Sequence, residues 1–436
     1  HSMKDKRAVV IGAGIIGCAI AFELQKKGCR VTCVDRNAAV GCGSTANSCA
    51  IVRTCYSTFQ GVALAYEGVF YWRDWANYIA DGQHSDLARY IECGMTQIKA
   101  PDEHWKKVLP IYDEIGIEYQ LLSLEELRVK YPFFDTASFW PPALPHDETF
   151  WDEPSAQVPG AIFNPGEGYV NDPQLATRNL CAAAEAHGAV FLLGRAVTAV
   201  RHNSGRVLGV TLHGGEELDA DIVVNVAGPH SFVINRMAGV EASMNVKTRA
   251  LRHEVHYVSA PEGVDFEHAG CPTSDNDNGI YFRPEVGNLL LVGSGDPPCD
   301  PLEWIEDPDD FNANVTEARW KAQTYRLAKR FLGLRVPNET MGIADLYDVS
   351  DDWIPIYDRS DLPGFYMAIG TSGNQFKNAA PAAHMLATLI EACERGHDHD
   401  RDPVKVKGRY TGLELDLGFF SRLRAVNRES SFSVLG

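Results

Sequence analysis

The chain has 436 residues, of which 45% are hydrophobic and 22% charged, a composition typical of a globular enzyme and not of a disordered protein. A chain of this length is long enough for two domains. Its formal net charge of −18 argues against nucleic acid and anionic membrane surfaces as partners. An anionic substrate therefore needs a local cationic site.

Cysteine usage and hydropathy indicate the compartment. The 11 cysteines are scattered without a C-x-x-C pair, which predicts reduced thiols and argues against a disulfide framework or a zinc site. No apolar run approaches the roughly 20 residues of a membrane span. A glycine motif begins almost at once, so we expect no signal peptide. We therefore expect a cytoplasmic protein that has neither a membrane span nor a metal centre.

Residues 7–36 predict a strand, a tight turn, a helix and a second strand. The turn holds a G-x-G-x-x-G motif at Gly12, Gly14 and Gly17. These glycines allow the tight turn, the close approach of a pyrophosphate and close helix–strand packing, with free N–H groups at the helix start. Asp35 lies about twenty residues further on, where an acid accepts a hydrogen bond from a ribose. The acid argues against NADP, while FAD and NAD both remain.

Two later stretches fit the same cofactor. Residues 39–53 form a loop of small residues, in which Ser44 and Thr45 can bond phosphate or ring heteroatoms. Residues 221–228 predict a buried strand that ends in an Ala-Gly pair and leaves room for a close neighbour. An ordinary solvent loop is the alternative for the first stretch, but its place directly after the dinucleotide unit favours cofactor contact.

The remaining segments predict helices and a mostly antiparallel sheet. Helical spacing occurs over four segments, which are residues 64–79, 173–187, 311–331 and 379–392. Short strands separated by polar turns occur over residues 255–258, 280–283 and 289–292. This sheet is a candidate substrate domain.

Seven blocks follow one another in a fixed order. They are the glycine motif with Asp35, Gly43-Ser-Thr running to Arg53, Gly168-Tyr-Val-Asn-Asp-Pro, Val223-Val-Asn-Val-Ala-Gly-Pro229, Gly279-Ile-Tyr-Phe-Arg-Pro284, Leu346-Tyr-Asp running to Pro355-Ile, and Gly370-Thr-Ser-Gly-Asn-Gln-Phe-Lys377. The ordered set resembles the D-amino-acid oxidase/sarcosine oxidase family of flavoproteins, and most of all its sarcosine-oxidase-like branch. The resemblance covers nearly the whole chain and points to FAD rather than NAD.

The resemblance implies an α/β fold in which a Rossmann-like FAD-binding domain is interleaved with an α+β substrate domain built on a mostly antiparallel sheet. We place residues 4–90, 155–235 and 336–436 in the FAD-binding domain, and residues 91–154 and 236–335 in the substrate-binding domain. The implied FAD contacts are Gly12, Gly14, Ile15, Ile16, Gly17, Asp35, Arg36, Gly43, Ser44, Thr45, Val197, Ala227, Gly228, Gly370, Gly373, Asn374, Gln375, Phe376 and Lys377.

The resemblance also implies a set of catalytic and substrate-binding residues. Arg53 and Lys377 match two cations that clamp the substrate carboxylate in sarcosine-oxidase-like enzymes, and Tyr281 matches an aromatic pocket residue. Lys377 has independent support, because it precedes a predicted helix whose dipole disfavours a cation by about 0.3–1 kcal/mol. A solvated lysine, a structural salt bridge of Arg53 and a sheet-core tyrosine are the alternatives. Arg252 and His253 are further substrate-binding candidates, able to hold a second carboxylate, with surface charge as the alternative.

Two positions depart from the family pattern. Asp345 stands where monomeric sarcosine oxidase carries the cysteine that binds its flavin covalently, so we expect noncovalent FAD. Leu291 stands where those oxidases place a lysine that activates oxygen. Dioxygen then either uses another cation or is not the natural acceptor.

The expected activity is the FAD-dependent oxidation of a small secondary amino acid, an N-substituted glycine such as sarcosine or iminodiacetate. Hydride transfer to the flavin leaves an imine, water hydrolyses it to a carbonyl acid plus an amine, and O2 is reduced to H2O2. One alternative is a flavin dehydrogenase that uses another acceptor, or the catalytic subunit of a hetero-oligomeric oxidase. A flavoprotein that uses FAD only for structure and an NAD-dependent dehydrogenase are the other two.

Overall fold

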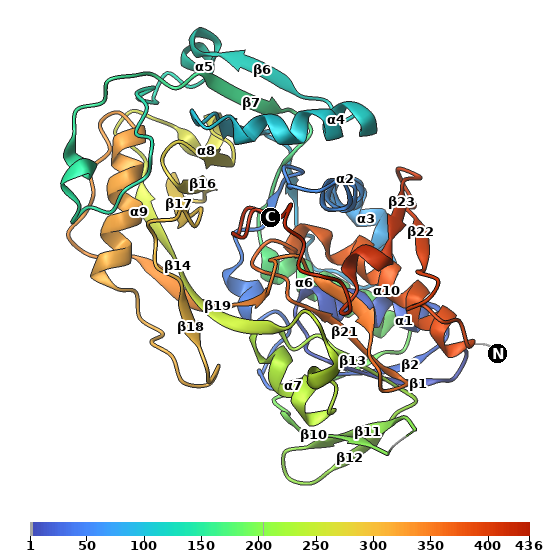
Figure 1. The fold of residues 1–436 in the computed structure, drawn as a ribbon. Coiled ribbons are helices and arrows are strands. Elements are labelled where there is room, and N and C mark those ends of the chain that lie inside the picture. The colour runs from blue at the N-terminus through green and yellow to red at the C-terminus, as the bar shows by residue number, and fades with distance from the viewer. Residues whose placement is uncertain (1–2, 204) are drawn as a thin grey trace.

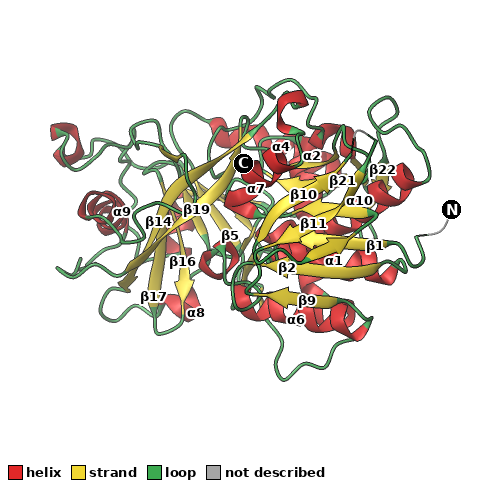
Figure 2. Cartoon of the chain, turned by 90° about the horizontal axis from the view of Figure 1, so that it is seen from below, coloured by secondary structure: helices red, strands yellow, loops and turns green. Residues whose placement is uncertain are grey.

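The computed structural model of the protein describes residues 3–203 and 205–436 (Figure 1). Two large sheets lie next to each other, and the chain passes between them several times (Figures 1 and 2). The predicted α/β fold is confirmed, with a Rossmann-like unit interleaved with a second unit that is built on a mostly antiparallel sheet. Within the described residues, no helix combines the length and the apolar composition that a bilayer crossing requires.

The first sheet has six strands in the order β20-β21-β13-β1-β2-β9, all parallel except β20 at the edge. Its central strands are runs of apolar residues because both of their faces are buried. The strands are β1 (Arg7–Ile11), β2 (Arg30–Asp35), β9 (Val190–Leu193), β13 (Ile222–Asn225), β20 (Ile356–Arg359) and β21 (Phe365–Ile369).

Different elements cover the two faces of this sheet. Helices α1 (Ile15–Lys26), α6 (Pro173–Ala186) and α10 (Ala379–Glu394) share a hydrophobic core with one face. On the other face lie helix α7 (Ser231–Met237) and an antiparallel sheet of β10 (Val197–His202), β11 (Val207–Leu212) and β12 (Glu217–Asp219). Because side chains alternate along a strand, Val10 packs on the helices while Val9 packs on the small sheet.

The second large sheet has nine strands, in the order β18-β14-β17-β16-β15-β5-β7-β6 with β19 also paired to β14. All pairs are antiparallel except β15 with β5. Its strands are β5 (Met95–Ile98), β6 (Gln120–Ser123), β7 (Gly160–Asn164), β14 (Thr248–Ser259), β15 (Thr273–Asp275), β16 (Ile280–Glu285), β17 (Leu289–Ser294), β18 (Glu303–Ile305) and β19 (Gly342–Ser350). Helices α5 (Leu124–Lys130), α8 (Phe266–Ala269) and α9 (Glu317–Arg330) bury one face of it.

Smaller elements complete the molecule. Strands β3 (Ile51–Val52), β8 (Gly168–Val170) and β4 (Tyr90–Ile91) form a three-stranded sheet, and β22 (Lys405–Lys407) pairs with β23 (Glu414–Asp416). The remaining α-helices are α2 (Phe59–Arg73), α3 (Trp75–Tyr78) and α4 (Leu109–Ile115). Single 3-10 turns are η1 (Ser44–Asn47), η2 (His104–Val108), η3 (Glu148–Trp151), η4 (Gly228–His230), η5 (Glu241–Ser243), η6 (Phe376–Asn378) and η7 (Leu417–Phe420).

Two of the helices predicted from the sequence have other limits. The helix expected over residues 311–331 begins at Glu317, because the Thr316 side chain accepts the Arg319 N–H and caps it there. The segment expected as one helix over residues 64–79 is split at Asp74 into α2 and α3.

Two of the domain boundaries predicted from the sequence differ from the division between the two large sheets. Strands β7 and β19 were placed in the FAD-binding domain, through residues 155–235 and 336–436, but both belong to the nine-stranded sheet. β19 pairs with β14 from Thr248 opposite Ser350 to His256 opposite Gly342. β7 lies between β5 and β6. The local pattern of a short strand does not reveal which distant strand it pairs with, and that pairing sets these boundaries.

Candidate active site

A cavity of about 650 Å³ begins at the carboxyl ends of β1, β2 and β13 and extends to β19 of the other sheet. Ligands of open α/β sheets bind at this end of the strands. The cavity is therefore bounded by both halves of the molecule.

The glycine motif shapes the start of this cavity. Gly12 has a φ of +115°, and a Cβ there would lie 2.0 Å from the Val226 carbonyl oxygen. A Cβ at Gly17 would lie 1.8 Å from the Gly12 carbonyl oxygen. Gly14 begins α1 without a side-chain cap, and the first turn of the helix lines the cavity. This is the arrangement that binds a pyrophosphate through backbone N–H groups.

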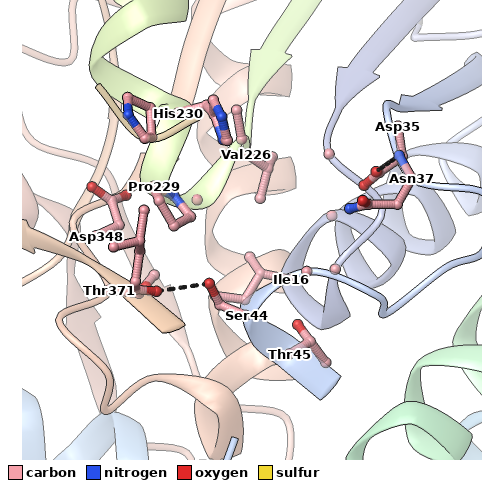
Figure 3. A pocket seen from close by; sticks show the side chains of 18 of the residues that line it. Ile16, Asp35, Asn37, Ser44, Thr45, Val226, Pro229, His230, Asp348 and Thr371 are labelled. Atoms are coloured by element: carbon pink, nitrogen blue, oxygen red, sulfur yellow. Dashed lines mark hydrogen bonds between the residues drawn. The ribbon is translucent and has the colours of Figure 1, made fainter. Parts of the chain in front are cut away.

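The two ends of the cavity differ. Asp35 lies at one end, where its carboxylate accepts the N–H groups of Ala13 and Asn37, each at 2.7 Å. Figure 3 shows Asp35 and Asn37 on one side of the cavity and Asp348 and Thr371 on the other. A dinucleotide with its pyrophosphate at the α1 start and a ribose near Asp35 would have its adenosine half at the first end. The second end is left for the other ring system.

Most of the residues predicted to bind FAD line this cavity. They are Gly12, Gly14, Ile15, Ile16, Gly17, Asp35, Arg36, Gly43, Ser44, Thr45, Val197, Ala227, Gly228, Gly373, Asn374, Gln375 and Phe376. Gly370 and Lys377 do not line it. Gly370 instead donates its N–H to the Asp348 carboxylate at 2.8 Å and so holds the loop that follows β21.

Several lining residues were missed from the sequence. They include Asn37, Asn47, Cys49, His230, Asp309, Asp345, Tyr347 and Asp348. Three of them lie in stretches that the sequence had already marked as cofactor-related, since Tyr347 and Asp348 belong to the block Leu346-Tyr-Asp and Cys49 belongs to the small-residue loop. No sequence feature marks Asp309, because it lies on a loop of the other half that reaches the cavity only in the folded molecule.

Asp348 is a buried acid beside the cavity. Burial raises the pKa of its carboxyl to about 7, although the hydrogen bond from Gly370 acts in the opposite direction. The hydroxyls of Ser231 and Thr248 also lower this pKa. A carboxyl of this kind is partly protonated near neutral pH.

A second cavity of about 40 Å³ adjoins the end of the large cavity away from Asp35. The two cavities share lining residues, which are Ser48, Cys49, Gly373, Asn374 and Phe376. Arg53, Lys377 and Tyr281 line the small cavity. Arg53 and Lys377 are the cationic side chains of its lining, and no others occur there among residues 3–203 and 205–436.

Lys377 is a buried lysine whose hydrogen-bond partners are neutral. Its Nζ donates to the Tyr56 hydroxyl and to the Asn374 carbonyl, both at 2.7 Å. Burial holds the pKa of its ammonium group well below the usual range, and the nearby charge of Arg53 lowers it further. Within the described part of the chain, no carboxylate forms an ion pair with this side chain. The solvated lysine considered from the sequence is therefore not what the structure contains.

Arg53 is also buried and is bound by peptide carbonyls. Its guanidinium donates to the carbonyl oxygens of Cys55 at 2.9 Å, Leu435 at 2.8 Å and Val434 at 3.1 Å. It lies 4.8 Å from the ring centroid of Tyr56. The described residues supply no carboxylate partner, so the structural salt bridge that the sequence left open is not formed.

Tyr281 forms a wall of the small cavity. Its ring lies over Gly293 of the neighbouring strand, where a Cβ would be 2.3 Å from the tyrosine Cζ. Its hydroxyl lies 3.5 Å from the Cys49 sulfur. The glycine thus creates the space that the aromatic ring occupies.

The prediction that Arg252 binds substrate is wrong. Its guanidinium donates to the Glu254 carboxylate at 2.6 Å and to the carbonyls of Asn312 and Asn314, on the face of β14 away from the cavities. His253 lies on the opposite face, as alternation along a strand requires. It stacks on Tyr347 with ring centroids 4.4 Å apart but lines neither cavity.

Leu291 and Asp345, the two positions that depart from the family pattern, lie in different environments. Leu291 is buried in an apolar cluster with Val255 and Tyr281. Asp345 lines the large cavity and accepts a hydrogen bond from the Asn47 amide. Asp345 supplies a carboxylate there and no thiol.

The family match now decides the identity of the dinucleotide. The description "DAO: FAD dependent oxidoreductase" matches residues 7–389. The chain belongs to this family. It is therefore an FAD-dependent oxidoreductase, and the lining of the large cavity fits FAD.

Individual relatives are similar to the chain at low identity. Glycine oxidase of Geobacillus kaustophilus is 24% identical over 396 residues, which cover 89% of this chain and 94% of that protein. The crystal structure of L-proline dehydrogenase from P. horikoshii has a TM-score of 0.74 at 20% identity and covers 96% of this chain and 97% of that one. Iminodiacetate oxidase from Chelativorans sp. BNC1 has a TM-score of 0.66 at 17% identity, with coverages of 91% and 98%.

Proposed function

We propose that the protein oxidises a small N-substituted glycine that carries one carboxylate, with sarcosine as the simplest candidate. The observation that carries this proposal is the pair of buried cationic side chains, Arg53 and Lys377, in a small cavity. This cavity adjoins the end of the large cavity away from Asp35, where we place the flavin. Both groups have only neutral hydrogen-bond partners among the described residues. The carboxyl of Glu167 interacts electrostatically with both, but burial raises its pKa to about 7, so it is partly protonated near neutral pH. Buried charges of this kind are stabilised by a counter-ion, and a substrate carboxylate supplies it.

The relatives support an amino acid over a simple amine. Their names refer to glycine, L-proline and iminodiacetate, each of which has an amino nitrogen one carbon away from a carboxylate. Iminodiacetate carries a second carboxylate, and the lining of the small cavity offers no third cationic side chain within the described residues. An unpaired buried carboxylate is costly. We therefore favour a substrate with one carboxylate and a small uncharged N-substituent.

The residues of the small cavity bind and orient this substrate in our proposal. Arg53 and Lys377 hold the carboxylate, whose negative charge favours the protonated form of Lys377. Tyr281 forms the wall beside the substrate. FAD, when bound, accepts the hydride from the carbon next to the amine.

The substrate loses a hydride from carbon and a proton from nitrogen, and so becomes an imine. Water hydrolyses the imine to a carbonyl acid, such as glyoxylate, and an amine. With O2 as the acceptor, the two electrons and two protons form H2O2.

A flavin dehydrogenase that uses another acceptor is the second candidate. The observation that favours it is Leu291, which is buried among apolar side chains and provides no cation for oxygen activation. Peroxide released by the purified chain, in one equivalent per substrate oxidised, supports the oxidase. Reduced flavin that persists in air and is reoxidised by an artificial acceptor supports the dehydrogenase.

An anaerobic reduction screen tests the substrate class. Sarcosine is expected to bleach the flavin absorbance at about 450 nm, and iminodiacetate is expected to do so far more slowly. Arg53→Gln and Lys377→Met are each expected to lower the second-order rate of reduction about 10- to 100-fold, because each removes a hydrogen bond to a charged group. Lys99→Met is the matched control, a buried lysine that lines neither cavity. The proposal is wrong if no N-substituted glycine reduces the flavin.

A further inference from the structure

Residues 430–436 lie between the two halves of the molecule. Figures 1 and 2 show this end of the chain between the six-stranded and the nine-stranded sheets. Val434 is buried in the same apolar cluster as Leu251 and Tyr281, on the face of the nine-stranded sheet that is turned to the small cavity. Phe432 and Leu435 pack against this cluster.

This segment occupies the donors of Arg53. One terminal nitrogen of the guanidinium, Nη1, donates to the Leu435 carbonyl at 2.8 Å, and the other, Nη2, donates to the Val434 carbonyl at 3.1 Å. Val434 and Leu435 also line the small cavity. The two carbonyl oxygens thus accept from the same pair of nitrogens that a carboxylate binds in a bidentate manner.

The segment is fixed by few other polar contacts. Ser57 donates its N–H at 3.1 Å and its hydroxyl at 2.7 Å to the Gly436 carbonyl. The Val434 N–H donates to the Asp296 carboxylate at 3.0 Å. Neither Ser57 nor Asp296 lines either cavity. The docking of the segment can therefore be weakened without changing the walls of the site.

The small cavity is too small for the proposed substrate. A volume of about 40 Å³ holds only a few water molecules and no amino acid. Hydrogen bonds between a guanidinium and a carboxylate are stronger than those between a guanidinium and neutral carbonyls. A substrate therefore fits only if residues 430–436 move. Its carboxylate can displace them, because it forms stronger hydrogen bonds with Arg53 than the two carbonyls do.

We propose that residues 430–436 compete with the substrate anion for Arg53, and that binding of the anion displaces the Val434 and Leu435 carbonyls and enlarges the small cavity. This inference rests on the proposed function, because it requires Arg53 to bind the substrate carboxylate. The segment raises the concentration of substrate needed to fill the site. It also excludes anions too weak to displace it.

The experiment measures the dissociation constant of acetate on the FAD-loaded enzyme, from the change in flavin absorbance. Ser57→Ala and Asp296→Asn each weaken the docking of the segment, and each is expected to tighten acetate binding about 3- to 10-fold, the effect of one hydrogen bond. Ser421→Ala is the matched control, since this serine lines neither cavity and is expected to leave the constant unchanged. Two variants at separate anchors keep the test available if one of them loses FAD.

The outcomes separate the two proposals. Wild-type acetate affinity in both docking variants, together with loss of binding in Arg53→Gln, overturns the competition and leaves the proposed function standing. Wild-type affinity in Arg53→Gln overturns the proposed anchor and the competition with it. Hydrogen exchange is the second readout, in which saturating acetate is expected to speed exchange of the amides of residues 430–436. Unchanged or slower exchange contradicts the displacement.

Discussion

Among single residues, Lys377 determines how the small cavity responds to an anion. Its ammonium group is buried against the Tyr56 hydroxyl and the Asn374 carbonyl, and its pKa is lowered by burial and by Arg53. A bound carboxylate favours the charged form, so anion binding takes up a proton over the pH range in which free Lys377 is neutral. Affinity must then fall as the pH rises through the lowered pKa.

We predict that acetate binds the FAD-loaded enzyme more weakly as the pH rises through a range below the ordinary lysine pKa of about 10.4, because the pKa of Lys377 is lowered. Lys377→Met is expected to bind about 10-fold more weakly at the low end of this range, because a hydrogen bond to a charged group is lost. It should retain only the pH dependence that the buried Glu167 carboxyl contributes, because the Glu167 pKa is raised to about 7. Absorbance titrations at several pH values measure both effects. Lys99→Met should behave as the wild type, and an unchanged pH profile in Lys377→Met contradicts the prediction.

The substrate-site residues show what a sequence can and cannot provide. Arg53 and Lys377 are more than three hundred residues apart, yet their motifs were sufficient to predict that both contribute to one site. Arg252 and His253 were both predicted to face the substrate, although neighbours on a strand point to opposite faces. Which face is turned to the cavity depends on what covers the other face, and the segment before α9 covers Arg252 through the carbonyls of Asn312 and Asn314.

Among elements, the pairing of β16 with β17 sets the wall of the small cavity. The Tyr281 ring occupies the space above Gly293, where a methyl group would lie 2.3 Å from the ring. Both strands are buried on the face that carries Leu291. The ring has little freedom to move away.

We therefore predict that Gly293→Ala destabilises the protein by about 1–3 kcal/mol, the usual cost of overpacking a core. It is also expected to slow flavin reduction by sarcosine, because the displaced ring alters the cavity wall. Gly295→Ala is the matched control, since a Cβ there meets its nearest atom, the Gly279 carbonyl oxygen, at 3.5 Å. Denaturant unfolding and anaerobic reduction measure the two effects, and equal behaviour of the two variants contradicts the prediction.

A second element contact joins β3 to β8 behind the cationic pair. Glu167, which precedes β8, accepts hydrogen bonds from the Thr54 N–H at 2.9 Å and the Thr54 hydroxyl at 2.7 Å. Burial raises the pKa of this carboxyl from its ordinary 4.5 to about 7. Between these values the folded protein binds more protons than the unfolded chain, so this group makes the protein less stable as the pH rises.

We predict that Glu167→Gln removes this component of the pH dependence. The stability of the variant relative to the wild type should increase between pH 5 and pH 8 by up to about 3 kcal/mol, since one pKa unit corresponds to about 1.4 kcal/mol. Urea unfolding of both FAD-loaded proteins at the two pH values measures the difference. Asp348, whose pKa is also raised to about 7, is present in both proteins and cancels. A difference that does not change with pH contradicts the prediction.

The strands show a different limit of sequence reading. The glycine motif and its two strands are local, and their prediction over residues 7–36 matches β1, α1 and β2 closely. β7 and β19 were assigned to the wrong half, because their partners β5, β6 and β14 lie tens of residues away along the chain. β7 is buried on both faces, so its pattern does not indicate which sheet it joins.

Across the whole molecule, the FAD cavity is the place where the two halves meet. Arg36 follows β2 of the six-stranded sheet, and His230 follows β13 of the same sheet. Asp309 comes from the loop between β18 and α9 of the other half, and its carboxylate lies 2.7 Å from the Arg36 guanidinium and 2.9 Å from the His230 ring. All three line the large cavity. This contact therefore joins the two halves of the molecule at the cavity.

We predict that Asp309→Ala releases FAD about 2- to 5-fold faster than the wild type and leaves the rate of flavin reduction by substrate unchanged. The effect is small because the paired side chains are about half exposed, and an exposed ion pair contributes roughly 0–1 kcal/mol. High salt should reduce the difference, since it screens exposed charges. The fluorescence of released FAD after dilution measures the rate. Asp310→Ala is the matched control, because it removes the same charge from the next residue, which does not line the cavity. Equal release from the two variants would show that the contact between the halves does not retain the cofactor.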